Sequence, residues 1–284
     1  MKYAAQYALI RTTLWLAKLV PFRVRGSIMA AVGGTLVRYV PSFRKRAEAG
    51  LTKVFPNMPT SERLALVRAV GRNIARTMTE LLFNAEFSKV AEQLPVHGPG
   101  LAVVKAAQAD GRGALIVSGH YGQWEAIRHA FRTQGIEVGA VYRPNNNPYY
   151  EPLFVKNVEI GGKPLAPKGT AGTKVMVRHL RKGGVMAILT DQKYGQGPTL
   201  DFLGHPASTT TAPAELALKY DLPLIPAYGI RTKDGLRIET EAPIPSSDAN
   251  TMMQAVNDSL AARVLADPTQ WHWLHQRWEL NKSD

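Results

Sequence analysis

The sequence predicts an α/β protein with a mostly parallel central sheet flanked by helices. Short apolar runs, such as residues 114–117 and 185–189, alternate with segments of helical length, as expected of strands that are buried on both faces. The composition is globular, with 45% hydrophobic and 20% charged residues, and no internal repeat stands out. We expect residues 51–284 to form a single α/β domain, and residues 1–50 to form a helical extension that precedes it.

The elements of the predicted domain follow in chain order. The first is one amphipathic helix over residues 61–87, with Ser61 at its cap and Leu64, Val67 and Ile74 on its apolar stripe. A hairpin is expected around the Lys-Asp-Gly turn at residues 233–235. The expected strands are 114–118, 137–142, 185–190, 223–231 and 236–241, and the expected helices are 100–110, 123–134, 148–159, 172–182, 212–220 and two more at the C-terminal end.

The first 50 residues carry much of the positive charge. They hold nine basic side chains and one acidic side chain, in a chain of 284 residues with a net charge of +13. Two apolar runs, within residues 1–20 and 26–37, are too short or too often interrupted by charges to span a bilayer or to form a cleaved signal peptide. We expect a basic, aromatic helix pair that lies on an anionic membrane surface. The alternative is that these helices pack on the domain. Nucleic-acid binding is not expected, because no nucleic-acid-binding motif accompanies the charge.

The segment SGHYGQWE, residues 118–125, places a histidine where ligands gather in parallel sheets. It follows the predicted strand 114–118, so His120 lies at the carboxyl end of that strand. Glu125 follows in the first turn of the next helix, close enough in sequence for its carboxylate to reach Nδ1 and leave Nε2 facing the cleft. Such a pair predicts a general base. The competing interpretation is that Glu125 only complements the helix dipole.

Polar side chains follow two further strands. Arg143 comes after the strand 137–142, where a guanidinium binds phosphate or stabilises an oxyanion, or else forms a surface salt bridge. Asp191 and Gln192 follow the strand 185–190, where they are candidates for the same site, and the alternative is that they cap a helix or turn. There is no G-x-S-x-G elbow and no cysteine, so we expect the substrate to supply the nucleophile. The spacing of the histidines matches no metal-binding motif, so we expect neither a metal site nor a cofactor. The aromatic segment around His272 and His275 is predicted to be a packed helix face.

Taken together, these segments resemble the bacterial lipid A biosynthesis (late) acyltransferases, of lauroyl or myristoyl type, within the glycerolipid acyltransferase superfamily. The resemblance rests on SGHYGQWE, YRPNNNP, LTDQ, the segment at residues 201–226 and DPTQWHWLHQRW, in that order along the chain. It places the family's H-x4-D/E box on His120 and Glu125, its arginine on Arg143, and its Asp-Gln pair on Asp191 and Gln192. The pattern departs from the family at Leu203 and Ala212, which bears on the identity of the substrate more than on the reaction.

The resemblance implies an O-acyltransferase at the cytoplasmic face of the inner membrane. It implies an acyl thioester donor, either acyl carrier protein or coenzyme A, and a membrane lipid acceptor, first of all a lipid A precursor. His120 would deprotonate the acceptor hydroxyl, and Glu125 would orient the histidine. A lyso-aminolipid or lyso-phospholipid is the alternative acceptor. The remaining alternatives are an acyl hydrolase and a basic membrane-binding protein without catalytic activity.

Overall fold

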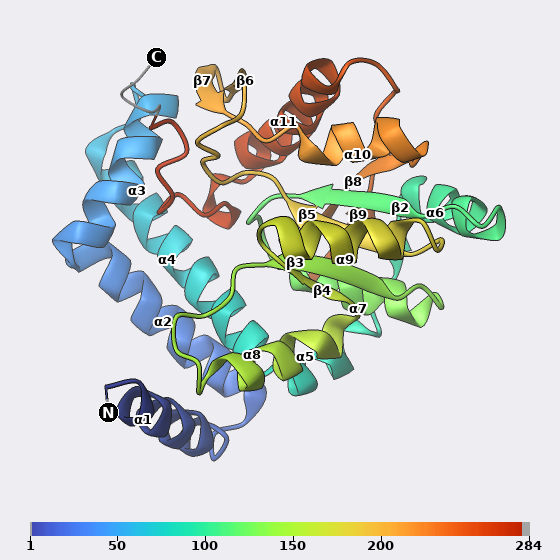
Figure 1. The fold of residues 1–284 in the computed structure, drawn as a ribbon. Coiled ribbons are helices and arrows are strands. Elements are labelled where there is room, and N and C mark those ends of the chain that lie inside the picture. The colour runs from blue at the N-terminus through green and yellow to red at the C-terminus, as the bar shows by residue number, and fades with distance from the viewer. Residues whose placement is uncertain (1, 280–284) are drawn as a thin grey trace.

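The computed structural model describes residues 2–279 (Figure 1). Met1 and residues 280–284, the outer ends of the two predicted segments 1–50 and 51–284, lie outside the described residues. A seven-stranded sheet with the order β1-β9-β8-β2-β5-β3-β4 forms the centre. Every strand pair in this sheet is parallel except β8 with β9. The predicted α/β class with a mostly parallel sheet is confirmed. The strands are β1 Val96–His97, β2 Ala114–Ser118, β3 Val138–Tyr142, β4 Leu165–Pro167, β5 Val185–Leu189, β8 Leu224–Thr232 and β9 Gly235–Thr240, with a separate hairpin of β6 Thr199–Phe202 and β7 His205–Ser208.

Helices cover both faces of the sheet (Figure 1). Alternate residues of β2 explain why. Ala114 and Ile116 pack into the core under the helices at residues 84–91, 100–109 and 125–133, whereas Leu115 and Val117 pack into the core under the helices at residues 170–180, 212–220 and 249–266. The helices are α1 Lys2–Ala17, α2 Phe22–Tyr39, α3 Pro41–Val54, α4 Thr60–Leu82, α5 Asn84–Ala91, α6 Gly100–Ala109, α7 Glu125–Thr133, α8 Glu151–Val158, α9 Thr170–Leu180, α10 Ala212–Tyr220 and α11 Ala249–Ala266, with short 3-10 turns at Glu159–Gly161 (η1) and Pro268–Gln270 (η2).

The N-terminal helices form a layer beside the sheet. α2 and α4 pack closely because glycines meet at their crossing, where a Cβ atom on Gly33 would lie 2.2 Å from the Cβ of Ala75. α1 buries none of its residues. It is held through Arg25, which is 4% exposed, donates to the carbonyl of Ala17 and pairs with Glu86 at 2.8 Å. Within residues 2–279, no helix is long and apolar enough to cross a bilayer.

Two predicted helices differ from the structure. The helix expected over residues 61–87 is divided, because the backbone turns at Phe83 (φ −111°, ψ 46°) and α5 begins at Asn84. The second C-terminal helix is absent from the described residues. After Asp267 the chain makes one 3-10 turn, its backbone then bonds to the loop around His120, with the N–H of His272 donating to the carbonyl of His120 at 3.1 Å, and it continues in short turns. Trp271 and Trp273 are buried in the core, as a packed segment requires, but in an irregular conformation.

Candidate active site

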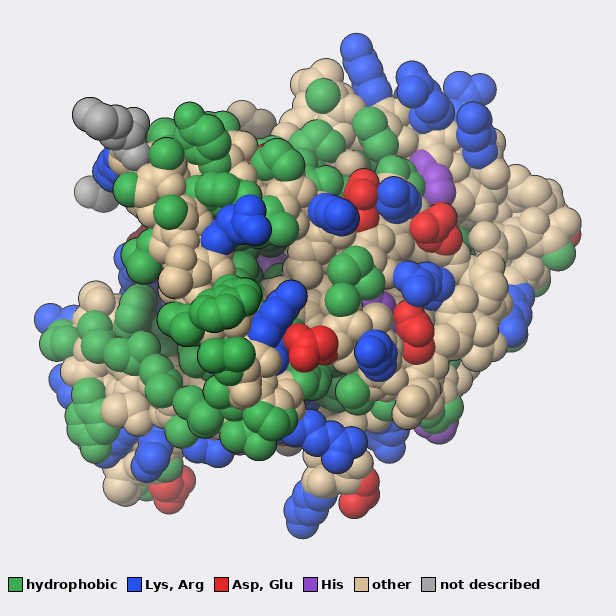
Figure 2. Space-filling model, turned by 90° about the horizontal axis from the view of Figure 1, so that it is seen from below, with side chains coloured by type: hydrophobic (Ala, Val, Ile, Leu, Met, Phe, Trp, Pro, Cys, Tyr) green, Lys and Arg blue, Asp and Glu red, His purple; other side chains and the backbone are tan. Residues whose placement is uncertain are grey.

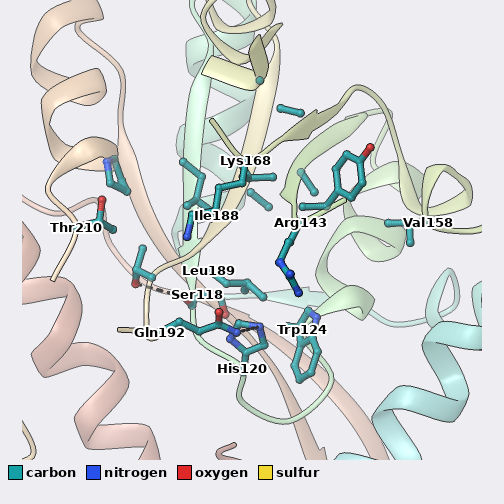
Figure 3. A pocket seen from close by; sticks show the side chains of 18 of the residues that line it. Ser118, His120, Trp124, Arg143, Val158, Lys168, Ile188, Leu189, Gln192 and Thr210 are labelled. Carbon is teal, nitrogen blue, oxygen red and sulfur yellow. Dashed lines mark hydrogen bonds between the residues drawn. The ribbon is translucent and has the colours of Figure 1, made fainter. Parts of the chain in front are cut away.

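A cavity of about 560 Å³ opens at the carboxyl edge of the sheet. It is lined by the ends of β2, β3, β4 and β5 and by residues of α4, α8 and α9. Most of its wall is apolar, with Ile116, Met176 and Leu189 among the contributors, and its polar side chains include His120, Arg143 and Gln192. Figure 3 shows these polar side chains converging from separate strand ends. The edge where the sequence predicts a site therefore carries a cavity.

His120 is held at this edge by Asp191. The pairing of β2 with β5 sets Ser118 opposite Leu189, so the residues that follow the two strands lie side by side. His120 Nδ1 is 2.7 Å from Asp191 Oδ1, and the backbone N–H of His120 donates to Oδ2 at 2.7 Å. A Cβ atom on Gly119 would lie 3.0 Å from that same Oδ2 and 2.5 Å from Leu260, so the close approach favours glycine. The sequence placed His120 and Asp191 at one edge but did not pair them.

Asp191 is buried and accepts a further hydrogen bond. The indole Nε1–H of Trp271, a residue 1% exposed, donates to Oδ2 at 2.8 Å. Burial alone would raise the pKa of Asp191, but the attraction of His120 and these hydrogen bonds outweigh burial and hold the pKa well below its ordinary value of 3.8. Asp191 is therefore a carboxylate near neutral pH. Because a carboxylate only accepts, the proton of a neutral His120 is on Nδ1, and Nε2 presents a lone pair.

Gln192 and His275 surround Nε2 of His120. The amide nitrogen of Gln192 is 3.2 Å from His120 Nε2 and 2.9 Å from His275 Nε2. An amide nitrogen carries two hydrogens, so it can donate to both rings, in agreement with the tautomer that Asp191 imposes. Burial lowers the pKa of His272 to about 3 and also lowers that of His275. These two histidines are neutral near pH 7 and place no positive charge beside His120.

Glu125 does not make the expected contact with Nδ1 of His120, which Asp191 occupies. It begins α7 and turns instead to Arg128, with Oε1 2.7 Å from Nη1 and side-chain exposures of 6% and 3%. Burial raises the pKa of Glu125, while the charge and hydrogen bond of Arg128 and a bond from Asn84 oppose the shift. A Cβ atom on Gly161 would lie 2.2 Å from Oε1, so the carboxylate fills the space beside η1. The catalytic role of Glu125 stays a prediction, and its contacts are structural.

Arg128 joins three segments of the cavity wall. Its guanidinium donates to the carbonyls of Val138 at 3.1 Å, at the start of β3, and Val158 at 3.3 Å, at the end of α8, and also to that of Gly162. Glu125 and Arg128 both border the cavity. The buried ion pair thus fixes the backbone around η1 against the sheet.

Arg143 reaches into the cavity from the end of β3, toward Trp124 and His120 (Figure 3). Its guanidinium makes one hydrogen bond, to Oδ1 of Asn146 at 3.4 Å, and no ion pair with a described carboxylate. The surface salt bridge considered from the sequence is thus not formed within residues 2–279. Among residues 2–279, no three histidine, aspartate or glutamate side chains are grouped so that they could hold a metal ion.

Comparison with known proteins identifies the family of this chain. The family model described as bacterial lipid A biosynthesis acyltransferase matches residues 1–280. The chain belongs to this family. The cavity and the polar side chains at the carboxyl edge of the sheet are thus those of a lipid A biosynthesis acyltransferase family member. The protein is an enzyme that transfers acyl groups.

The relatives of this protein are named for more than one lipid. The lipid A biosynthesis acyltransferase of Haemophilus influenzae is 26% identical over 93% of this chain and 84% of its own length. The lipid A biosynthesis lauroyltransferase of Escherichia coli is 26% identical over 94% and 89%. A phosphatidylinositol mannoside acyltransferase of Mycobacterium tuberculosis is 25% identical over 69% and 64%.

Three residues of the site escaped the sequence interpretation. The sequence predicts Trp271, His272 and His275 on a packed helix face, yet Trp271 donates to Asp191 and both histidines line the cavity. The available signal is the aspartate-proline pair before them, which disfavours a helix that continues through residue 267, together with large rings at alternate positions 271, 273 and 275.

Proposed function

We propose that this acyltransferase moves a fatty acyl chain from an acyl thioester to a hydroxyl of a membrane lipid, in the first place a lipid A precursor. The observation that carries the proposal is His120, whose Nε2 faces a largely apolar cavity while Asp191 holds Nδ1. The family supports lipid A as the acceptor, because the two relatives with high coverage described above are both named for lipid A biosynthesis.

In the proposed reaction, His120 acts as the general base. Nε2 takes the proton of the acceptor hydroxyl as its oxygen attacks the thioester carbonyl, and the carboxylate of Asp191 stabilises the imidazolium. The tetrahedral intermediate then collapses with cleavage of the C–S bond. The thiolate leaves and takes the proton from Nε2, which returns His120 to its starting state. The products are the acyl ester and the free thiol of the donor.

Glu125 has a different role in this mechanism from the one that the H-x4-E spacing predicts. Its carboxylate neutralises Arg128, and the pair holds the wall of the cavity. Gln192 donates to Nε2 in the absence of substrate, so the acceptor hydroxyl takes its place when it binds. Arg143 lies where it can meet an anionic group of a substrate or the developing oxyanion.

The apolar part of the cavity is the proposed site of the acyl chain. Phe154, Met176 and Val158 border it, and a volume of about 560 Å³ lies in the range of roughly 300–1,000 Å³ typical of small-molecule sites. The donor is an acyl carrier protein or coenzyme A thioester.

Membrane attachment through the N-terminal helices is the second part of the proposal. α1 exposes Leu9 and Trp15 at 69% and 63%, and α2 exposes an apolar stripe at Ile28, Val32 and Leu36. Figure 2 shows hydrophobic side chains gathered on the side of the molecule where α1 lies, with Lys and Arg side chains at the margin. An exposed apolar surface with basic neighbours suits an anionic bilayer. We propose the cytoplasmic face of the inner membrane, where thioester donors are available.

The test is transfer by the purified enzyme. Labelled acyl carrier protein or acyl-CoA is incubated with a lipid A precursor, and acylated lipid and free fatty acid are separated and counted. His120→Ala should lower the rate by at least about 100-fold. His97→Ala, a substitution of an exposed histidine outside the cavity, is the matched control. Full transfer by His120→Ala would exclude the base, and fatty acid released without acceptor at the rate of transfer would indicate a hydrolase.

The alternative acceptor is a lyso-aminolipid or lyso-phospholipid. The observation that favours it is the similarity to a phosphatidylinositol mannoside acyltransferase, a family relative named for another lipid. Lipid profiling of a deletion strain separates the two acceptors. Loss of a secondary acyl chain from lipid A supports the first, and accumulation of a lyso-lipid supports the second.

A further inference from the structure

Lys168 lies beside Arg143 because β3 and β4 are paired. The register sets Tyr142 opposite Pro167, and the backbone N–H of Lys168 donates to the carbonyl of Tyr142 at 2.7 Å. The residues after these two strands therefore leave the sheet together. Both side chains line the cavity, and Figure 3 shows both on the same side of His120.

Neither cation has a carboxylate partner among the described residues. The ammonium of Lys168 makes only a ring contact, 6.0 Å from the centre of Tyr194, and Arg143 bonds only to Asn146. Glu151, the first acidic residue after Arg143 in the chain, has its two oxygens taken by Tyr142 and Asn145. The cavity thus holds two positive charges, from neighbouring strand ends, that no described carboxylate neutralises.

The surroundings increase the positive potential at this place. α9 begins at Thr170, two residues after Lys168, with no acidic residue in its first turn and no side-chain cap. Arg128 and Arg231, by contrast, are paired with Glu125 and Glu80. Two cations without carboxylate partners in a largely apolar cavity suit an anionic ligand, and a guanidinium and an ammonium lining one cavity suit the several oxygens of a phosphate.

We propose that Lys168 and Arg143 together form a phosphate-binding site at the entrance of the acyl cavity. The inference rests on the proposed acyl transfer and deepens it by assigning a recognition role to Lys168. Phosphate is carried both by the pantetheine arm of an acyl carrier protein or coenzyme A and by phosphorylated lipid head groups. The site therefore recognises one chemical group, and experiment decides which substrate presents it.

The test compares Lys168→Gln with Lys168→Arg and with Lys174→Gln. Lys174 is an exposed lysine in the next turn of α9 that does not line the cavity, so it controls for the loss of one charge. Inorganic pyrophosphate is used as an inhibitor of transfer by each enzyme. Its inhibition constant should rise about tenfold in Lys168→Gln, as expected for loss of one charge-assisted contact, and remain near the wild-type value in Lys168→Arg and Lys174→Gln.

The kinetic pattern identifies the source of the phosphate. Inhibition competitive with acyl-CoA assigns the site to the donor, and inhibition competitive with the lipid assigns it to the acceptor. A thioester of N-acetylcysteamine, which has no phosphate, adds a second measurement. If the donor phosphate is bound, the KM defect of Lys168→Gln disappears with this donor, and if the acceptor phosphate is bound, the KM for the lipid stays raised.

Equal inhibition constants in the wild type and Lys168→Gln, or an equal loss in Lys174→Gln, would overturn the phosphate site while leaving the acyl transfer in place. A wild-type enzyme without transfer activity refutes the proposed function instead. The two failures are therefore distinguishable.

Discussion

Replacing Glu125 by glutamine separates a catalytic role from a structural one. If Glu125 acts through Arg128, the substitution leaves a guanidinium that is 3% exposed without its counter-charge, although its bonds to the carbonyls of Val138, Val158 and Gly162 remain. Loss of one partner from a buried ion pair costs about 3–5 kcal/mol. In a domain of this size, 1 kcal/mol corresponds to roughly 2–4 °C, so the melting temperature should fall by roughly 6–20 °C.

The matching double variant, Glu125→Leu with Arg128→Met, removes both charges. Replacement of a buried pair by apolar side chains is often neutral, so part of the lost stability should return, less the cost of the three carbonyls that Arg128 no longer satisfies. Melting is followed by calorimetry and transfer by the labelled-lipid assay, at a temperature below the transition of every variant.

The opposite result has a clear signature. A Glu125→Gln enzyme that melts like the wild type but loses about 1,000-fold in kcat would mean that Glu125 acts on the reacting groups. The structural interpretation of its bond to Arg128 would then be refuted.

Further predictions concern the groups around His120 and the N-terminal helices. Asp191→Asn should lower kcat by about 10²–10⁴-fold at neutral pH, because the imidazolium loses its counter-charge, and single-turnover rates would show it. Since the pKa of Asp191 is lowered on folding, the stability that its carboxylate provides is present above pH 3.8 and is lost as pH falls below this value. The stability difference between wild type and Asp191→Asn should shrink in acid unfolding experiments below pH 3.8, and a difference that grows there would contradict the assigned shift. Trp271→Phe removes one hydrogen bond to Asp191 and should reduce kcat by about tenfold while KM changes little. Trp15→Glu with Leu19→Glu should move the protein from sedimenting vesicles to the supernatant without changing its melting temperature, because both side chains are more than 60% exposed.

The fold followed from the sequence wherever a strong local pattern existed. β2 and β5 are continuous apolar runs, and the structure has them at Ala114–Ser118 and Val185–Leu189, close to the predicted bounds. Short strands gave no such pattern. β4 has three residues and includes Pro167, so only its pairing with β3 makes it a strand. It is this strand that positions Lys168.

The sequence predicted which residues lie at the site, but it did not predict which of their side chains contact each other. The carboxyl-edge rule placed His120, Arg143 and Asp191 together, because it depends only on which residues follow parallel strands. The partner of His120 depends on the order of strands in the sheet. β2 and β5 are neighbours although 66 residues separate Ser118 from Val185, and sequence spacing favours Glu125 simply because it is near in the chain.

The H-x4-E spacing retains a physical meaning even though the two side chains do not meet at Nδ1. His120 belongs to the loop after β2, and Glu125 begins α7, so the four intervening residues set the distance from the strand end to the helix start. That distance allows the base to face Asp191 on one side while the carboxylate, one turn before Arg128, faces η1 on the other. Glu125 and Arg128 lie three residues apart on α7, so their contact does not depend on this spacer, but a longer or shorter spacer would move the pair relative to His120 and to the carbonyls of Val158 and Gly162. One short motif thus serves two purposes: its histidine is proposed to react with the substrate, and its glutamate pairs with the arginine that holds the wall against which the acyl chain is proposed to lie.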